Sequence, residues 1–259
     1  MRKFSALAAL VALCCAGVGV ANAGQANIDA NGTALSLDAS FSPPITSSKS
    51  TRQGVTLELH QFYGNVRGNP TPTEGADVNV GLPGGTVFNS AAFAACPLPT
   101  DPKQFGVRSR CPAASQVGTG TVQVDARKSG LTDPLNGTVV VYNGAKSGST
   151  PTVILMASLP TPGGGEIITE IDMKVEKGPK LVGYDPLNRP RGSSLYDITR
   201  LDLAVGKTVG VKANGKNIKV PFLQAPVVCK KNWAFSLTLV RDSGTQTATD
   251  TAPCQKVVG

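Results

Sequence analysis

Side chains that commonly carry catalysis are scarce in this sequence. His60 is the only histidine among 259 residues, so a Ser-His-Asp site would have to use it. No Gly-x-Ser-x-Gly segment, which would place a nucleophilic serine on a sharp turn, accompanies it. Apolar Val55, Leu57 and Leu59 alternate with polar residues here, which places His60 on the polar face of a strand. We therefore interpret His60 as an exposed surface residue and predict no catalytic residue.

Residues for metal, nucleotide and sugar sites are also scarce. One histidine excludes a histidine-rich metal site, and no glycine-rich loop followed by Lys-Ser/Thr is present to cradle phosphates. Aromatic residues make up 5% of the chain, whereas carbohydrate-binding modules usually present exposed aromatic platforms. The loop candidates for such a platform are Tyr63, Tyr184 and Tyr196. We expect no cofactor, no bound metal and no nucleic-acid partner, and a carbohydrate-binding module stays an alternative function.

The long apolar run of this chain lies at its start. Two basic residues precede an almost wholly apolar stretch, residues 6–20, which is followed by the small-x-small sequence Ala-Asn-Ala at residues 21–23. This run is shorter than the roughly 20 residues that span a bilayer. The pattern predicts a signal peptide over residues 1–23, cleaved after Ala23, and a protein that is secreted or held in the cell envelope. A lipoprotein signal at Cys15 is the alternative, and we expect no transmembrane segment in the mature chain.

Strand patterns occupy most of the remaining chain. Short runs of alternating apolar and polar residues recur, separated by segments rich in Gly and Pro. No long segment has a helical period, and strands do not alternate with helices, which argues against nucleotide-binding α/β folds. We predict an all-β protein, an antiparallel β-sandwich that forms a single domain over residues 24–259. A subdivision near residues 160–165 is the alternative, and the sequence predicts no oligomeric state.

The most specific local pattern is a hairpin over residues 209–220. Asn214-Gly215 suits the positive backbone angles of a two-residue type I′ turn. That register brings apolar residues together on one face of the hairpin, Val211 opposite Ile218 and Val209 opposite Val220. Lys212 and Lys219 then point to the other face, toward solvent.

This hairpin lies in the most basic part of the chain. Residues 174–231 hold twelve basic and four acidic residues, so their net charge equals the formal net charge of +8 of the whole chain. Such an asymmetry indicates an anionic partner, and a solvated basic face is the alternative. We predict a non-catalytic binding or structural protein that contacts an anionic cell-envelope polymer or surface. The candidate binding residues are Lys207, Lys212, Lys216, Lys219, Lys230 and Lys231.

Four cysteines follow residue 23, and an even count in an exported chain favours two disulfides. Cys96 and Cys111 flank a charged, Pro-rich loop, whereas Cys229 and Cys254 flank Trp233 and an apolar strand. We predict the local pairing Cys96–Cys111 and Cys229–Cys254 over two crossed alternatives, with paired Cα atoms about 4.4–6.8 Å apart. Zinc is the competing interpretation, but metal-binding cysteines usually come as close doublets, which these are not. Trp233 is interpreted as core.

An alternative hypothesis is catalytic and depends on two carboxylates. Glycosidases use a pair of facing carboxylates, and Glu170 and Asp172 share one side of a predicted strand. Because Lys174 and Lys177 follow them, an ordinary charged strand face explains the same pattern. A secreted, glycosidase-like hydrolase using Glu170 and Asp172 therefore stays an alternative.

Two segments resemble a family of exported, β-rich actinobacterial proteins. Residues 111–121, CPAASQVGTGT, are similar to its Cys-Pro-x-x-Ser-x-Val-Gly-x-Gly segment, and a short cysteine-containing stretch precedes it at residues 89–96. The second similarity is the C-terminal unit that runs from Cys229 through Trp233 to Cys254. Taken with the residues around them, roughly 82–138 and 220–254, the two similarities cover somewhat over a third of the chain.

The resemblance implies an exported β-sandwich. Most members of the family lack an assigned activity, so it implies no catalytic residues. In physical terms, Gly118 and Gly120 inside a strand predict a bulge or a close approach of two backbones.

Overall fold

The computed structural model describes residues 27–28, 33–43, 52–65, 77–97, 111–131, 134–184, 197–227, 232–241 and 244–254, and the predicted signal peptide lies outside them. These residues form strands and three short 3-10 helices, with no α-helix among them. Every strand ladder between them is antiparallel, so the all-β, antiparallel part of the prediction is confirmed. In this part of the chain, no helix is long and apolar enough to cross a membrane.

The described strands are numbered in chain order. The first eight are β1 (Asn27–Ile28), β2 (Thr33–Ser42), β3 (Gly54–Asn65), β4 (Asp77–Gly81), β5 (Val87–Phe88), β6 (Gln116–Asp125), β7 (Leu135–Ser147) and β8 (Thr150–Pro160). The later ones are β9 (Glu166–Glu176), β10 (Lys180–Tyr184), β11 (Asp197–Val205), β12 (Thr208–Ala213), β13 (Lys216–Pro221), β14 (Leu223–Gln224), β15 (Asn232–Arg241) and β16 (Gly244–Pro253). The 3-10 helices are η1 (Ser90–Ala92), η2 (Ala113–Ser115) and η3 (Arg127–Ser129).

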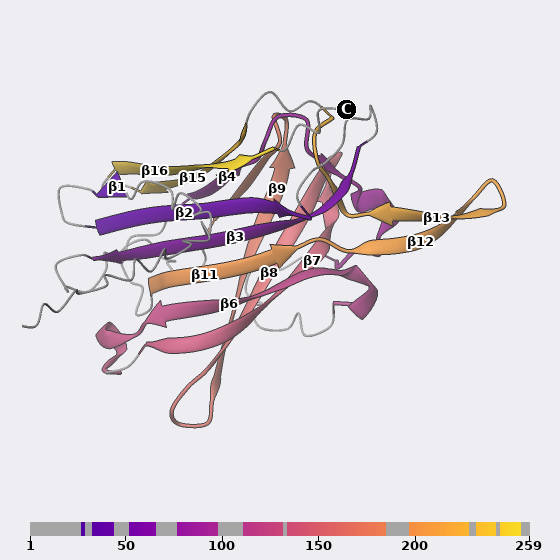
Figure 1. Cartoon of the computed structure of the whole chain (residues 1–259). Coiled ribbons are helices and arrows are strands. Elements are labelled where there is room, and N and C mark those ends of the chain that lie inside the picture. Colours follow the sequence, from indigo (N-terminus) through magenta and orange to yellow (C-terminus); the bar gives the residue numbers. More distant parts are fainter. Residues whose placement is uncertain are drawn as a thin grey trace, which may run out of the picture.

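One large sheet contains 14 of these strands. Its main path runs β1-β2-β3-β11-β6-β7-β8-β9-β10-β4-β15-β16, and β14 joins β3 to β5 beside it. The sheet curls until β16 lies against β2, so the strands from β2 to β16 on this path surround one interior (Figure 1). The right-handed twist between neighbouring strands accumulates along a long sheet and lets it curl. The predicted β-sandwich is not confirmed, because the strands follow one another in a single sheet.

The alternative prediction divides the chain near residues 160–165, which connect two strands of this sheet. They include the turn between β8 and β9, in which the N–H of Thr161 bonds the carbonyl of Gly165. The two strands on either side pair with each other from Thr152–Lys174 to Pro160–Glu166. This segment therefore joins two neighbouring strands of one sheet.

The two ends of the sheet meet at a seam that side chains stabilise. Asp250 of β16 is buried, and its Oδ2 accepts a hydrogen bond of 2.7 Å from the backbone N–H of Ala39 in β2. Beside it, Phe41 of β2 packs edge-to-face against Trp233 and Phe235 of β15, with ring centroids 6.4 and 5.3 Å apart. Since a buried backbone N–H without a partner is unfavourable, the Asp250 carboxylate stabilises the edge of β2 at this seam.

Connecting segments pack across one end of the curled sheet, which we call the covered end. Phe222, just before β14, is fully buried and packs edge-to-face against Phe88 and Phe93, with ring centroids 5.9 and 5.2 Å apart. Asn143, buried near the end of β7, donates hydrogen bonds from Nδ2 to the carbonyl oxygen atoms of Ser90 and Ala94. At the opposite end β3 and β15 finish, and we call it the Arg241 end.

Two glycines of β6 let β11 approach closely. A Cβ atom at Gly120 would lie 2.0 Å from the carbonyl oxygen of Asp202, and one at Gly118 would lie 2.5 Å from that of Ala204. The β6–β7 ladder also shifts register between Gln116 and Gly118, which marks a bulge. Both features that these glycines predict, a bulge and a close backbone approach, are present.

One predicted disulfide is confirmed. Cys96 and Cys111 are bonded, with Cα atoms 4.9 Å apart, inside the expected range. Cys254 is also disulfide-bonded, but Cys229 lies outside the described residues. The pairing Cys229–Cys254 therefore stays a prediction.

The predicted hairpin is confirmed in register and in turn type. β12 and β13 form a separate two-stranded sheet, in which Val211 pairs with Ile218. Asn214 and Gly215 have φ values of 50° and 73°, the positive angles that a type I′ turn requires. The hairpin follows β11 at the covered end and projects away from the curled sheet (Figure 1).

Candidate functional site

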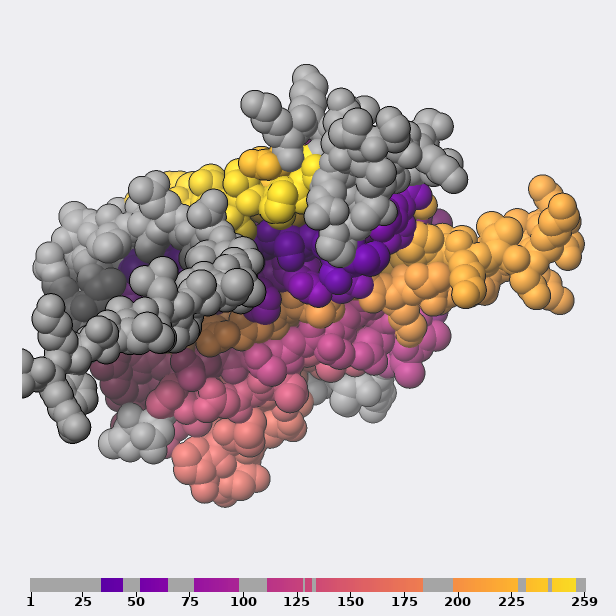
Figure 2. Space-filling model, viewed as in Figure 1, coloured from indigo at the N-terminus to yellow at the C-terminus, as the bar shows by residue number. Residues whose placement is uncertain are grey.

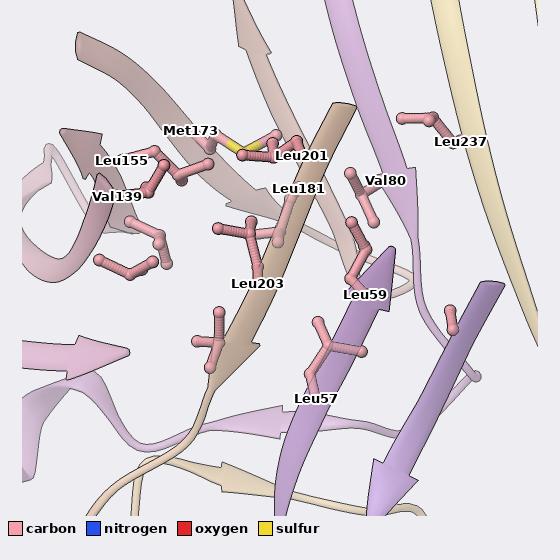
Figure 3. Close-up of a cluster of buried hydrophobic side chains, with 14 of the residues drawn as sticks. Leu57, Leu59, Val80, Val139, Leu155, Met173, Leu181, Leu201, Leu203 and Leu237 are labelled. Atoms are coloured by element: carbon pink, nitrogen blue, oxygen red, sulfur yellow. The ribbon is translucent and has the colours of Figure 1, made fainter. Parts of the chain in front are cut away.

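The curled sheet encloses an apolar cavity of about 90 Å³. Strands on all sides of the interior contribute to its lining, which consists mainly of Leu, Val and Ile. Figure 3 shows several of these side chains pointing into one shared interior, among them Leu59, Leu155, Leu181 and Leu203. Protein cores contain few voids larger than a water molecule, so a cavity of this size needs a structural cause.

The number of strands supplies that cause. The interior of a curled sheet widens as strands are added, and at about eight strands side chains just fill it. Here the path from β2 to β16 has eleven strands, so opposite walls stand further apart than their side chains reach. Inward-facing Leu155, Ile171 and Leu203 accordingly keep 7 to 9% of their surface exposed, although they belong to the core.

A polar cluster lies where this cavity reaches the Arg241 end. Arg241 continues the inward face of β15 after Leu239, and both residues line the cavity. The guanidinium carbon of Arg241 lies 4.5 Å from the ring centroid of Tyr63, and its Nη1 donates a hydrogen bond of 3.0 Å to Oε1 of Gln246. Gln61 lines the same region. Among the described residues, no carboxylate forms an ion pair with Arg241. One end of an apolar cavity therefore carries a cation.

The candidate binding lysines are divided between the hairpin and a part of the chain outside the described residues. Those on the hairpin or at its base are all exposed: Lys207, Lys212, Lys216 and Lys219. Lys230 and Lys231 lie outside the described residues. Lys212 pairs with Asn217 and Lys219 pairs with Gly210, which places both lysines on one face, as predicted. Figure 2 shows the hairpin extending well beyond the rest of the surface.

The other face of the hairpin is apolar. It carries Val209, Val211, Ile218 and Val220, and Ile218 has 44% of its surface exposed. The charge around it has one sign, because the chain has no acidic residue from position 203 to position 241. The hairpin thus combines an apolar face with lysines that no acidic neighbour in its own segment can neutralise.

His60 is exposed, as predicted, but the prediction did not anticipate its partner. Its Nδ1 lies 2.8 Å from Oδ1 of Asp202 on β11, which pairs with it across the ladder. Nε of Arg200 donates a 2.7 Å hydrogen bond to the other oxygen of Asp202. Partial burial alone would raise the pKa of Asp202, but the hydrogen bonds and charges of Arg200 and His60 outweigh it and lower this pKa. Arg200 and Asp202 also border a groove on the outer face, and Arg200 lines the interior cavity as well, so it is a second cation of the lining in addition to Arg241.

The two carboxylates of the hydrolase alternative lie on the outer side of β9. Glu170 is buried and Asp172 is exposed, and both stand on the strand face opposite inward-pointing Ile171 and Met173. Neither lines the interior cavity or the outer groove. The structure therefore places the pair on one strand face, as predicted, and away from both hollows.

The aromatic candidates have different positions. Tyr63 points inward beneath Arg241 and does not form an exposed platform. The side chains of Tyr184 and Tyr196 lie outside the described residues. Trp233 is buried in the core, as predicted, and packs against Phe41.

Arg241 and the cavity were not predicted from the sequence, although one signal was present. Alternate residues of β15 form an apolar face, Trp233, Phe235, Leu237 and Leu239, and Arg241 is the next residue on that face. A cation that ends an inward-facing apolar row indicates a polar group at the rim of the core. The interior that this row helps to surround depends on strand order, which alternation alone does not give.

Comparison with known proteins leaves the family of this chain open. No protein-family model, no curated protein and no solved structure matches it significantly. The similarity to exported actinobacterial proteins therefore rests on the segments at residues 111–121 and 229–254.

Proposed function

We propose that this chain is an exported, non-catalytic binding protein that contacts anionic polymers of the cell envelope through the projecting hairpin of β12 and β13. In this proposal residues 1–23 are removed, and a second disulfide, Cys229–Cys254, joins the C-terminal end to the sheet. The observation that carries the proposal is the hairpin itself, which projects from the sheet and bears exposed lysines with no acidic residue in its own segment, residues 203–241.

The distribution of the lysines favours a polymer over a single small anion. Lys207 stands at the base of the hairpin, Lys212 and Lys219 on one face, and Lys216 next to the turn. Six-residue strands at about 3.3 Å per residue give the hairpin a length of about 20 Å. Charges spread over such a length can contact several anionic groups of one chain at once, whereas a small ion can contact only one or two.

Salt provides the first test of this contact. Exposed charges are screened over about 10 Å at 0.1 M salt and about 3 Å at 1 M salt, so lysine-mediated binding should be weak and salt-sensitive. The probe is dextran sulfate, with uncharged dextran as its control, and binding is measured by biolayer interferometry at 0.05, 0.15 and 1 M sodium chloride. We expect binding to dextran sulfate alone, with loss at 1 M salt. Unchanged binding at 1 M salt, or no binding at 0.05 M, would contradict the proposal.

Matched variants test which lysines are responsible. The double variant Lys212→Gln/Lys219→Gln removes two charges from the hairpin, and Lys174→Gln/Lys177→Gln removes two exposed charges from the region of β9. We expect the hairpin variant to weaken binding to dextran sulfate several-fold more than the β9 variant. Equal weakening would show that net charge, rather than the hairpin, determines binding.

A lipid surface is the competing partner, because the hairpin also has an apolar face. Vesicles of phosphatidylglycerol and phosphatidylcholine test it, with Ile218→Ser as the variant. Binding to anionic vesicles that survives 1 M salt and is lost in the Ile218 variant would replace the polymer by a membrane surface.

A further inference from the structure

We propose that the interior cavity is a second, independent binding site, for an anionic amphiphile with a single alkyl chain. The alkyl chain occupies the apolar cavity, and the carboxylate or phosphate of the ligand pairs with Arg241. This proposal does not depend on the function proposed for the hairpin.

The lining sets the chemistry of the inner part of the site. The lining is mainly aliphatic, with residues such as Leu59, Val80 and Leu181 on different strands. Two aromatic and a few polar side chains complete it: Tyr63, Phe88, Gln61, Thr199, Arg200 and Arg241. Its aliphatic part offers no hydrogen-bond partners to water, and apolar cavities in proteins stay dry and accept apolar guests. Each methylene group that moves from water into such a cavity contributes favourably to binding.

The volume of the cavity restricts the size of the ligand. Its volume of about 90 Å³ is smaller than the roughly 150 Å³ that holds benzene in an engineered apolar cavity. A ring the size of benzene therefore exceeds this volume, whereas the end of an unbranched chain can occupy it. Met173 in the lining is unbranched and has three rotatable bonds, so it can move aside as a chain lengthens.

The polar cluster sets the chemistry of the outer part. A guanidinium has five N–H donors, and Nη1 of Arg241 uses one on Gln246. Stacking on Tyr63 fixes the plane of the guanidinium, and among the described residues no carboxylate neutralises it. A planar, oriented guanidinium suits a carboxylate or a phosphate in a two-point contact. An anionic head at the rim with an apolar tail inside matches both halves of the site.

The position of Arg241 separates this site from the hairpin. β11 begins at the Arg241 end and finishes at the covered end, where the hairpin follows it. Contact of the hairpin with a polymer would therefore occur at the opposite end of the sheet from Arg241, and one protein could hold both ligands.

Calorimetric titration with fatty acids tests the proposal. The probes are hexanoate, octanoate, decanoate and dodecanoate below their micelle concentrations, with decanol as the uncharged counterpart of decanoate. We expect affinity to rise about fourfold for each added methylene until the cavity is full, and then to level off. Decanoate should bind more tightly than decanol. Absence of saturable binding for every chain length would overturn the proposal.

Variants distinguish the site from adventitious binding. Arg241→Gln should lower the affinity for decanoate at least tenfold and leave the affinity for decanol unchanged. Lys174→Gln, which removes an exposed charge from β9, should change neither affinity. The double variant Lys212→Gln/Lys219→Gln should also keep decanoate binding. Loss of polymer binding at the hairpin and loss of decanoate binding at the cavity can therefore be told apart. Equal effects of Arg241→Gln and Lys174→Gln would show binding to surface charge and contradict the proposal.

A variant that fills the cavity provides the second measurement. Leu203→Phe adds bulk at a lining position, and it should abolish binding of both decanoate and decanol. Its circular dichroism and thermal unfolding are compared with the parent protein, because overpacking can disturb a core. Undiminished decanol binding by a folded Leu203→Phe protein would place the alkyl chain elsewhere and overturn the proposal.

Discussion

The curled sheet and the projecting hairpin share one sequence pattern, but they differ in what covers their apolar faces. Leu237 on β15 is fully buried, because the inward face of the sheet packs against its own opposite wall and the connecting segments. Ile218 on β13 has a similar place in an alternating strand, yet nearly half of its surface is exposed. Two-stranded hairpins are marginally stable in water by themselves. The proposed contact with a partner would account for a hairpin that adds little buried surface to the fold.

The two regions also differ in how they treat charge. In and beside the curled sheet, opposite charges stand together, as in Arg200 with Asp202 on β11 and Arg127 of η3 with Asp125 at the end of β6. On the hairpin, lysines are the only charged residues. Charges that are paired within the molecule contribute to its fold, whereas charges of one sign on a projecting element are available to another molecule.

The largest expected contrast comes from removing the same kind of side chain in each region. Leu237→Ala should lower the free energy of unfolding by about 2–5 kcal/mol, because it opens a cavity in a fully packed part of the core. Ile218→Ala should change it by less than about 0.5 kcal/mol, since the side chain is largely exposed. Urea unfolding monitored by circular dichroism measures both. A loss above about 2 kcal/mol for Ile218→Ala would show that the hairpin is part of the core after all.

Two glycines in strands give the second contrast. Gly120→Ala places a Cβ atom 2.0 Å from the backbone oxygen of Asp202, which forces β6 and β11 apart and should destabilise by about 1–3 kcal/mol. At Gly210 in β12, a Cβ atom would meet no other atom within 4 Å, so Gly210→Ala should be neutral or slightly stabilising. Thermal unfolding of the two variants checks this. Similar shifts in Tm would mean that the close approach of β6 and β11 relaxes easily.

The hairpin could be predicted from the sequence because all its information is local. The turn residues Asn214 and Gly215 lie between two strands that pair only with each other, so alternation and turn type fix the register. The same holds for the single local disulfide that the structure describes, Cys96–Cys111. Features that join residues close in the chain leave few alternatives to choose from.

The curled sheet could not be predicted in the same way, because its order depends on distant pairings. β11 lies between β3 and β6, and β4 lies between β10 and β15, although long stretches of chain separate these strands. Alternation indicates which face of a strand is apolar, but it does not indicate how many strands surround that face. The cavity and the inward cation Arg241 follow from that number, so they became visible only in three dimensions.

The C-terminal strand has no alternating apolar pattern that would predict it. β16 is mostly Thr, Gln and Asp, and its inward positions include Gln246 and Asp250. Polar residues at buried positions remove the alternation that marks a strand. At this seam they have a structural role, because Asp250 bonds the backbone of β2 and Gln246 accepts a hydrogen bond from Arg241.

The smallest expected effect concerns charge pairing on the outer face of the sheet. Arg200 and His60 lower the pKa of Asp202 against the effect of partial burial, so the folded protein holds this carboxyl ionised to a lower pH than the unfolded chain does. A group whose pKa is lowered by folding stabilises the fold fully above its unfolded value, near 3.9, and loses that contribution as pH falls through the lower, folded value. The parent protein should therefore lose part of its advantage over Asp202→Asn between pH 5 and pH 2.5. Because the partners of Asp202, His60 and Arg200, are exposed, the difference in free energy of unfolding between the parent and Asp202→Asn at pH 6 should stay within about 1 kcal/mol.

Urea unfolding of the parent protein and of Asp202→Asn at pH 6, 5, 4, 3 and 2.5 measures this window, and Lys212→Gln on the hairpin is the control. Lys212 has no acidic neighbour in its segment, so its replacement should give a difference from the parent that does not vary with pH in this range. His60→Ala should shift the free energy of unfolding by no more than about 0.5 kcal/mol, the usual range for an exposed position. A difference between the parent and Asp202→Asn that stays constant down to pH 2.5 would mean that Asp202 titrates alike in both states. The contacts of Asp202 with Arg200 and His60 would then contribute nothing to stability. The sheet and the hairpin would differ in where their charges lie, but not in what those charges contribute to the fold.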